Sequence, residues 1–128
     1  MTSETLLHRQ VNPSWIQAGR ISSQVFRPTL KDEKLLSVYD GDLIRPENAW
    51  VHFVHVLGFR SIGVVAVTMG ECQSLDLPVR PDQTYFPEHA VIDFSACSGG
   101  EIERKAKYLK VTAEARGWLY QYSGGDGA

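Results

Sequence analysis

Apolar residues gather in short runs that are separated by polar turns, and the spacing within each run predicts its secondary structure. The segment 61–67, with the sequence SIGVVAV, is apolar on both faces of an extended chain, and the segment 90–94, AVIDF, is similar. Runs of this length, rich in β-branched residues, are typical of buried strands. We therefore predict that 62–67 and 90–94 are neighbouring inner strands of one sheet.

Two segments have the spacing of amphipathic helices. In 46–57, large apolar residues recur at i, i+3, i+4 and i+7, and they are Trp50, Phe53, Val54 and Leu57. The longest helix is predicted over 100–116, where Ser98 and Glu101 form a capping box at its start and Gly117 suits its end. We expect these two helices to cover the sheet, on one face or on both.

Weaker signals predict the remaining elements. Asn12 and Pro13 suit the N-cap and first position of a short helix that ends near Gly19. Shorter strands are predicted over 6–11, 21–26, 35–39 and 118–122. The whole pattern predicts an α/β (α+β) fold, a single compact domain over 1–122 with a mixed sheet of about five or six strands packed by two main helices. Residues 123–128 are small and polar, and we expect a disordered tail there.

Composition and charge narrow the classes of function. The chain has 128 residues, 43% of them hydrophobic, and a net charge of -2. This charge is too small to attract nucleic acid or an anionic membrane, so we expect neither as a partner. The N-terminus lacks the features of a signal peptide, and no segment approaches the ~20 apolar residues of a membrane span. We therefore expect a soluble, cytoplasmic protein.

Candidate metal ligands are few. Cys72 and Cys97 have no partner at C-x-x-C spacing, which argues against a zinc site built on thiolates. We expect two reduced, buried thiols, and a single disulfide between them is the alternative. His52 and His55 have the i, i+3 spacing of a metal pair, but a third ligand is only loosely placed, and the alternative is two partly exposed helix residues. We therefore expect no metal site.

A carboxylate and an imidazole stand side by side at the start of the predicted strand 90–94. Glu88 and His89 together have the chemistry of a general base and its partner. Sites on sheets tend to form at the mouths of strands, and Tyr85 and Phe86 would wall a pocket there. The alternative is a solvated loop that is anchored by a packed aromatic side chain.

A second polar cluster interrupts the first predicted strand. Alternation along this strand places His8 and Gln10 on one face and Arg9 on the other. Polar residues that break a strand pattern mark functional sites in some proteins and ordinary solvated faces in others. The chain has no G-x-S-x-G, no G-x-G-x-x-G and no G-x-x-x-x-G-K, so a standard hydrolase elbow and the standard nucleotide-binding motifs are excluded.

The chain resembles two groups of proteins. From 7 to 122 it is similar to small bacterial proteins that carry H-R-Q, F-R-P, L-S-V-Y and H-A-V-I-D-F segments, to which we attach no activity. It also resembles ADP-ribosyltransferases that have a His on the first strand, a Tyr on the second and a Glu before a late strand. The matching residues here are His8, Tyr39 and Glu88. The resemblance implies that His8 binds the nicotinamide ribose, that Tyr39 stacks on the nicotinamide, and that Glu88 orients the ribose and activates the acceptor.

Three functions follow as hypotheses. The first is a small cytosolic bacterial interaction or accessory protein that binds another protein through aromatic residues and needs no cofactor; the candidate anchors are Trp15, Tyr85, Phe86, Trp118 and Tyr122. The alternative is a small enzyme that acts on NAD or a related nucleotide. Its candidate catalytic residues are His8, Tyr39, Glu88 and His89, and its candidate cofactor-binding residues are Arg9 and Tyr85. A metal-dependent hydrolase built on His52 and His55 is the third.

Overall fold

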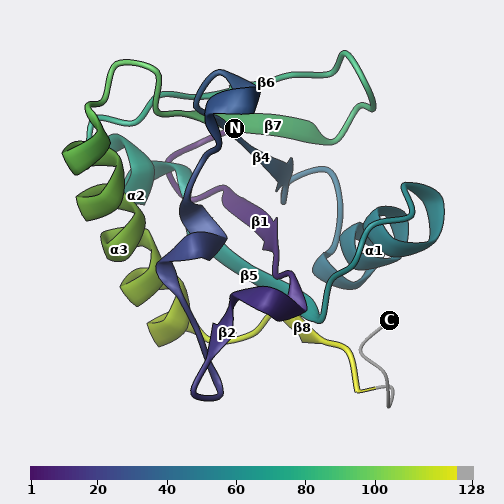
Figure 1. Cartoon of the computed structure of the whole chain (residues 1–128). Helices are drawn as coiled ribbons and strands as arrows, with labels where there is room; N and C mark the ends of the chain where they lie inside the picture. The colour runs from purple at the N-terminus through teal and green to yellow at the C-terminus, as the bar shows by residue number, and fades with distance from the viewer. Residues whose placement is uncertain (124–128) are drawn as a thin grey trace.

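Six strands form the main sheet of the protein, in the order β6-β7-β4-β1-β5-β8 (Figure 1). The computed structural model describes residues 1–123, so the tail expected over 123–128 lies, apart from Ser123, outside the described residues. The strands of this sheet are β1 (Leu6–Gln10), β4 (Leu35–Asp40), β5 (Gly63–Thr68), β6 (Val79–Pro81), β7 (His89–Asp93) and β8 (Tyr120–Gln121). Each pairing within it is antiparallel. The predicted α/β class is confirmed, and the sheet is antiparallel rather than mixed.

The two most apolar strands, β5 and β7, are both inner strands, as their composition predicts. The prediction that they are neighbours is wrong, because β4 and β1 lie between them. The strand β1 has β5 on one side and β4 on the other, while β7 pairs with β4 and β6. Each apolar strand therefore lies one position from an edge, and the polar-containing strands β1 and β4 occupy the centre.

The two main helices cover opposite faces of the sheet (Figure 1). The long helix α3 (Gly99–Arg116) packs on the face that carries the main core. The strand residues of this core are Leu7, Leu36, Val38, Val65, Val67, Ala90 and Ile92. The other face is covered at one end by α1 (Pro46–Val51) and by the π-helical turn η4 (His52–Val56) that continues it. The predicted helix over 46–57 is therefore present, but its second half is wound as a π-helix.

The segment 12–26 differs from its prediction. Asn12 does cap a turn, since its side chain accepts a hydrogen bond from the Ser14 N–H at 2.9 Å, but the turn is only the 3₁₀ helix η1 (Pro13–Trp15). Ala18 and Gly19, with φ of 51° and 76°, then form the tight turn of a hairpin. Its strands are β2 (Ile16–Gln17) and β3 (Arg20–Ile21).

The strand predicted over 21–26 is instead the 3₁₀ helix η2 (Ser23–Phe26), followed by η3 (Leu30–Asp32). Val25 and Phe26 are fully buried, and η2 packs against α3. Burial of these two side chains in the core, rather than strand pairing, accounts for their apolar character. The apolar pattern that predicted a strand over 21–26 therefore arises from side chains buried in a 3₁₀ helix.

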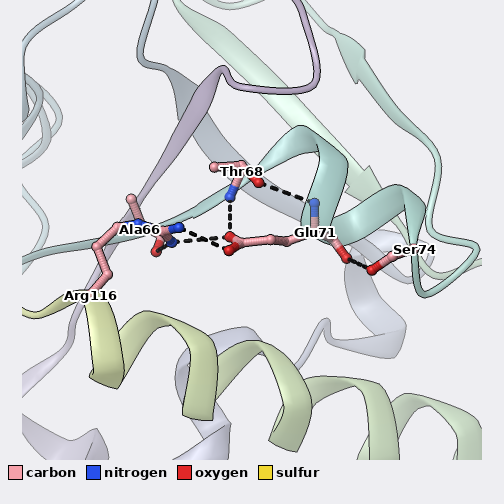
Figure 2. A network of polar contacts seen from close by, with 5 residues as sticks. All are labelled: Ala66, Thr68, Glu71, Ser74 and Arg116. Atoms are coloured by element: carbon pink, nitrogen blue, oxygen red, sulfur yellow. Dashed lines mark hydrogen bonds and ion pairs between the residues drawn. The ribbon is translucent and has the colours of Figure 1, made fainter.

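A network around Glu71 joins three elements of the fold (Figure 2). The short helix α2 (Met69–Gln73) begins with a capping box, in which Thr68 and Glu71 exchange hydrogen bonds. The same carboxylate receives two hydrogen bonds from Arg116, at 2.8 and 3.0 Å, and Arg116 also donates to the Ala66 carbonyl. Burial alone would raise the pKa of Glu71, but these hydrogen bonds hold it below its ordinary value. The network ties α2 and β5 to the last turn of α3.

Both cysteines are buried as free thiols, as predicted. Cys72 lies in α2 and Cys97 directly precedes the start of α3, and both contribute to the main core. Burial raises the pKa of the Cys72 thiol to about 12. The thiolate is the reactive form of cysteine, so Cys72 is an unreactive core residue.

Candidate functional site

The main sheet is split between β1 and β4. These strands pair at only two positions, Leu7 with Asp40 and His8 with Tyr39. Beyond His8, β1 continues its pairing with β5, whereas β4 continues its pairing with β7. The two halves of the sheet therefore separate after the His8–Tyr39 pair.

A cleft of about 620 Å³, here called the main cleft, lies at this separation. Its size is in the range of small-molecule sites. Strands β1, β4 and β7 form its bottom, while η4 and the loop between β6 and β7 form its sides. The apolar stripe predicted on the 46–57 helix is divided here, since Trp50 is buried but Phe53 and Leu57 border the cleft and Leu57 is 38% exposed. Part of the apolar surface of this helix thus belongs to the cleft and not to a core.

Three of the predicted catalytic residues form a row across the bottom of the main cleft. His8 lies opposite Tyr39, and Tyr39 lies opposite His89, on three adjacent strands. Directly opposed side chains in an antiparallel sheet have Cβ atoms ~4.5–5.5 Å apart. All three residues line the cleft. The structure therefore brings His8, Tyr39 and His89 together.

Glu88 lies beside this row but does not line the main cleft. Its backbone carbonyl accepts a hydrogen bond from the Asp40 N–H at 2.8 Å, where the β4–β7 ladder ends. Burial raises the pKa of Tyr39, and the Glu88 carboxylate raises it further, so the Tyr39 phenol is protonated. Because neighbouring strand residues point to opposite faces, His89 rather than Glu88 faces the cleft.

Two buried polar side chains at the bottom of the main cleft have atoms without hydrogen-bond partners. His8 Nε2 lies 3.2 Å from the Ile44 carbonyl and is therefore the protonated nitrogen, while His8 Nδ1 has no partner among residues 1–123. Both polar atoms of the Gln10 side-chain amide are also unpartnered, and Gln10 is 5% exposed. An unsatisfied buried polar group costs about 1–3 kcal/mol, so such groups call for an explanation. Both residues line the main cleft, so these atoms are available to polar groups that enter it.

Burial lowers the pKa of His8, although the Ile44 carbonyl and the charges of Asp40 and Glu47 oppose this shift. The imidazole is therefore neutral at neutral pH. In the neutral form with Nε2 protonated, Nδ1 is a hydrogen-bond acceptor. His8 thus offers an acceptor to a hydroxyl or amide N–H in the cleft.

Tyr39 connects the bottom of the main cleft to its side. Its Oη lies 2.8 Å from His52 Nδ1, within hydrogen-bonding distance. Phe86 packs against both rings, with centroid distances of 5.2 Å to Tyr39 and 4.6 Å to His52. The sequence indicated His52 only as half of a metal pair. No group of three metal-ligating side chains occurs within residues 1–123, and the position of His52 is explained by Tyr39.

His89 is oriented by the loop that precedes β7. Its Nδ1 lies 2.7 Å from the Asp82 carbonyl and 3.7 Å from the Asp82 carboxylate, so Nδ1 carries the proton. Its Nε2 is then an acceptor, and the Ser37 hydroxyl donates to it at 3.1 Å. A hydroxyl, a base and a group that orients the base are the parts of an acid–base site. Ser37 was not predicted because it lies in no known serine motif.

A smaller hollow of about 310 Å³, here called the side cleft, adjoins the main cleft. Arg9, Gln10, Phe53 and Phe59 line both of them. The predicted ligand-binding residue Arg9 bridges the split in the sheet, because its guanidinium donates to the Val25 carbonyl at 2.6 Å and to the Ser37 carbonyl at 2.9 Å. The other predicted ligand-binding residue, Tyr85, lies at the edge of the main cleft and is 81% exposed.

Comparisons of the chain with models of known protein families, with curated proteins and with solved structures found no match. Fold and site together define an antiparallel α/β protein with a ligand-sized cleft in a split sheet. Within residues 1–123, no helix has the length and apolar character needed to cross a membrane. The function has to be inferred from the side chains of the cleft.

Proposed function

We propose that the protein is a small enzyme that binds NAD, or a related nicotinamide nucleotide, in the main cleft and transfers its ADP-ribose group. The observation that carries this proposal is the row of His8, Tyr39 and His89 across three adjacent strands at the bottom of the cleft. Among the strands of the main sheet, β1 comes first along the chain and β4 second. The ADP-ribosyltransferases that the chain resembles have His and Tyr on these two strands.

The side chains of the main cleft suit the nicotinamide riboside part of such a ligand. Phe86 offers aromatic surface to a planar ring, which favours stacking, and the buried Tyr39 ring packs against Phe86. His8 Nδ1 is a free acceptor for a ribose hydroxyl. The Gln10 amide, whose donor and acceptor are both unpartnered, matches the donor and acceptor of a carboxamide.

We assign the proton transfer of this reaction to His89. Its Nε2 accepts the proton of an attacking hydroxyl or water while the oxygen of that group bonds to C1′ of the ribose. The bond between C1′ and the pyridinium nitrogen breaks, and its electron pair leaves with neutral nicotinamide. The Asp82 carbonyl stabilises the required tautomer of His89. Glu88, the residue that the family resemblance favours for this role, precedes His89 in the chain and does not line the cleft. Its charge raises the pKa of the Tyr39 phenol.

The test combines binding and turnover. Calorimetric titration with NAD is expected to give a saturable signal, and chromatography is expected to detect nicotinamide release that falls at least ~100-fold in His89→Gln, a typical contribution of a general base. Glu88→Gln is the matched control for the neighbouring position and is expected to retain most of the rate. Absence of both a heat signal and nicotinamide release at millimolar NAD would contradict the proposal. Loss of the rate in Glu88→Gln alone would move the base to Glu88.

A second candidate, binding to another protein, is favoured by the apolar rim of the main cleft, which we define as Val56, Phe59 and Tyr85. These side chains are 68%, 57% and 81% exposed. Large exposed apolar residues that lie together are typical of interaction surfaces. A stoichiometric partner that binds the wild-type protein but not a Val56→Ser, Phe59→Ser double variant would support this function, and the same partner retained by the variant would contradict it.

A further inference from the structure

We propose that the side cleft is a phosphate subsite, in which Arg9 and Arg60 bind the anionic part of a ligand whose ring lies in the main cleft. The ligand class is therefore a nucleotide rather than a nucleoside or a free base. This inference rests on the proposed function for the identity of the ring, whereas the anion site itself depends only on the two arginines and their surroundings.

Arg9 is a half-buried charge that no carboxylate neutralises. Its two hydrogen bonds go to the neutral carbonyls of Val25 and Ser37, and its guanidinium lies over the Trp15 ring at 5.2 Å. Among residues 1–123, no Asp or Glu oxygen lies within 4.0 Å of it. Burial lowers the pKa of Arg9 to about 10, and the distant charge of Asp32 only partly compensates.

Removal of a charged group from water is costly unless a counter-charge replaces the lost hydration. An arginine that is half-buried and has no acidic partner is therefore expected where an anion binds. Arg9 has five N–H donors, and the two carbonyls use only two of them. The remaining donors are available to phosphate oxygens, for which the guanidinium geometry is well suited.

The surroundings of the side cleft have the charge that this role requires. No Asp or Glu lines it, and a second cation, Arg60, lies in its wall. Arg60 is exposed and has no acidic partner within 4.0 Å in the described chain. The protein as a whole has a net charge of -2, so this pair of unneutralised arginines is a local exception and not a general basic surface.

The side cleft adjoins the main cleft, so the phosphate of a ligand can lie in the side cleft while its ring lies in the main cleft. The two clefts share Gln10 and Phe53, so a ligand can extend from one to the other without leaving the protein surface. Tyr39, Phe86 and the three histidines line only the main cleft, whereas Asn12 and Arg60 line only the side cleft and Arg9 lines both. A planar ring and a phosphate joined by a sugar have this same division between apolar and anionic parts.

The experiment compares two ligands on the wild-type protein, nicotinamide riboside and nicotinamide mononucleotide, which differ only by one phosphate. Calorimetry is expected to show that the mononucleotide binds at least roughly tenfold more tightly, the usual gain from a charge-assisted hydrogen bond. Inorganic pyrophosphate, which contains no ring, is expected to bind as well and to compete with the mononucleotide. Equal affinities for the two nicotinamide compounds, or no binding of pyrophosphate, would overturn the inference.

Variants locate the subsite. Arg9→Gln and Arg60→Gln are expected to remove most of the gain that the phosphate provides, while Arg27→Gln, a surface arginine paired with Glu103, is the control that retains it. Circular dichroism and thermal unfolding check the fold of each variant. If Arg9→Gln does not fold, the ligand comparison and Arg60→Gln decide. A folded Arg9→Gln with unchanged selectivity for the mononucleotide contradicts the inference.

The failure of this inference differs from the failure of the proposed function. If pyrophosphate binding depends on Arg9 but neither nicotinamide compound competes with it and NAD is not cleaved, the phosphate subsite stands and the nicotinamide function is wrong. If NAD is cleaved but the phosphate gives no gain in affinity, the function stands and the subsite is wrong. Absence of all binding overturns both.

Discussion

The hydroxyl of Tyr39 lies 2.8 Å from Nδ1 of His52, and this bond links a central strand of the sheet to the π-helical turn η4. The residues are separated by 13 positions in the chain. Single π-helical turns are rare and are frequent at functional sites, where they change the direction of side chains within a helix. In this protein the π-helical turn contains the histidine that Tyr39 contacts, so the winding of η4 and the geometry of the main cleft belong together.

Removal of this hydrogen bond tests its contribution to stability. Tyr39→Phe keeps the ring against Phe86 but removes the hydroxyl that forms the hydrogen bond with His52, so we expect the free energy of unfolding to fall by about 1 kcal/mol. Urea denaturation measures this change. Tyr108→Phe is the matched control, because Tyr108 is exposed on α3, and it is expected to have almost no effect. Equal effects of the two substitutions would show that the Tyr39–His52 bond contributes nothing.

Local signals in the sequence predicted the elements that local interactions determine. The predicted capping box at Ser98 formed, because it depends on residues only three positions apart. Strand β4 and helix α3 were found for the same reason. By contrast, the hairpin over 16–21 depends on positive φ at Ala18, and an alanine gives little indication of this conformation.

The site was predictable only in part, because its assembly depends on pairing between distant strands. His8, Tyr39 and His89 were each selected for their chemistry, but only the order β7-β4-β1 brings them into one row. Ser37 was missed, and His52 was considered only as a metal ligand, since each acquires its place in the cleft from a partner that the sequence does not identify. Antiparallel pairing has no local signature for which strand lies beside which, and the wrong expectation that 62–67 and 90–94 are neighbours has the same cause.

The buried histidine of β1 makes stability depend on pH. Burial lowers the pKa of His8 in the folded protein below the unfolded value of 6.5, so between these two values the unfolded chain binds the proton and the folded chain does not. The free energy of unfolding is therefore expected to decrease as the pH falls below 6.5 and to stop decreasing through His8 once the folded pKa is passed. His8→Gln is expected to flatten this part of the profile, and NMR titration of the ring gives the folded pKa directly. A His8 pKa at or above 6.5 would contradict the explanation.

The carboxylate of Glu71 is expected to stabilise the fold through two interactions at once. Glu71→Gln weakens the capping box of α2 and removes the ion pair to Arg116, and we expect a loss of about 1–2 kcal/mol in the free energy of unfolding. Glu101→Gln at the start of α3 is the matched control, because Glu101 forms the same kind of capping box without an arginine partner. The difference between the two variants measures the contribution of Arg116.

The Glu71–Arg116 pair also makes stability depend on pH, but through a carboxylate that loses its ion pair in acid rather than through a buried imidazole. The pKa of Glu71 is lowered in the folded protein, so its contribution is present above the unfolded value of 4.5 and is lost as the pH falls through the folded pKa. Glu71→Gln is therefore expected to be destabilising at neutral pH and nearly neutral in acid. Chemical denaturation at pH 7 and pH 3 tests this, and a loss that is the same at both values would contradict it.

The Ser37–His89 pair distinguishes two kinds of chemistry in the main cleft. If His89 is the base for an incoming hydroxyl, the Ser37 hydroxyl only occupies Nε2 in the free protein and must be displaced when the acceptor binds. Ser37→Ala is then expected to keep nicotinamide release within an order of magnitude of the wild-type rate, whereas His89→Gln abolishes it. If Ser37 were instead a nucleophile activated by His89, both substitutions would remove the activity to a similar degree, and mass spectrometry of the wild-type protein after reaction with NAD would show ADP-ribose on Ser37. The 3.1 Å hydrogen bond is common to both mechanisms, so the rate of Ser37→Ala, and not the geometry, separates them.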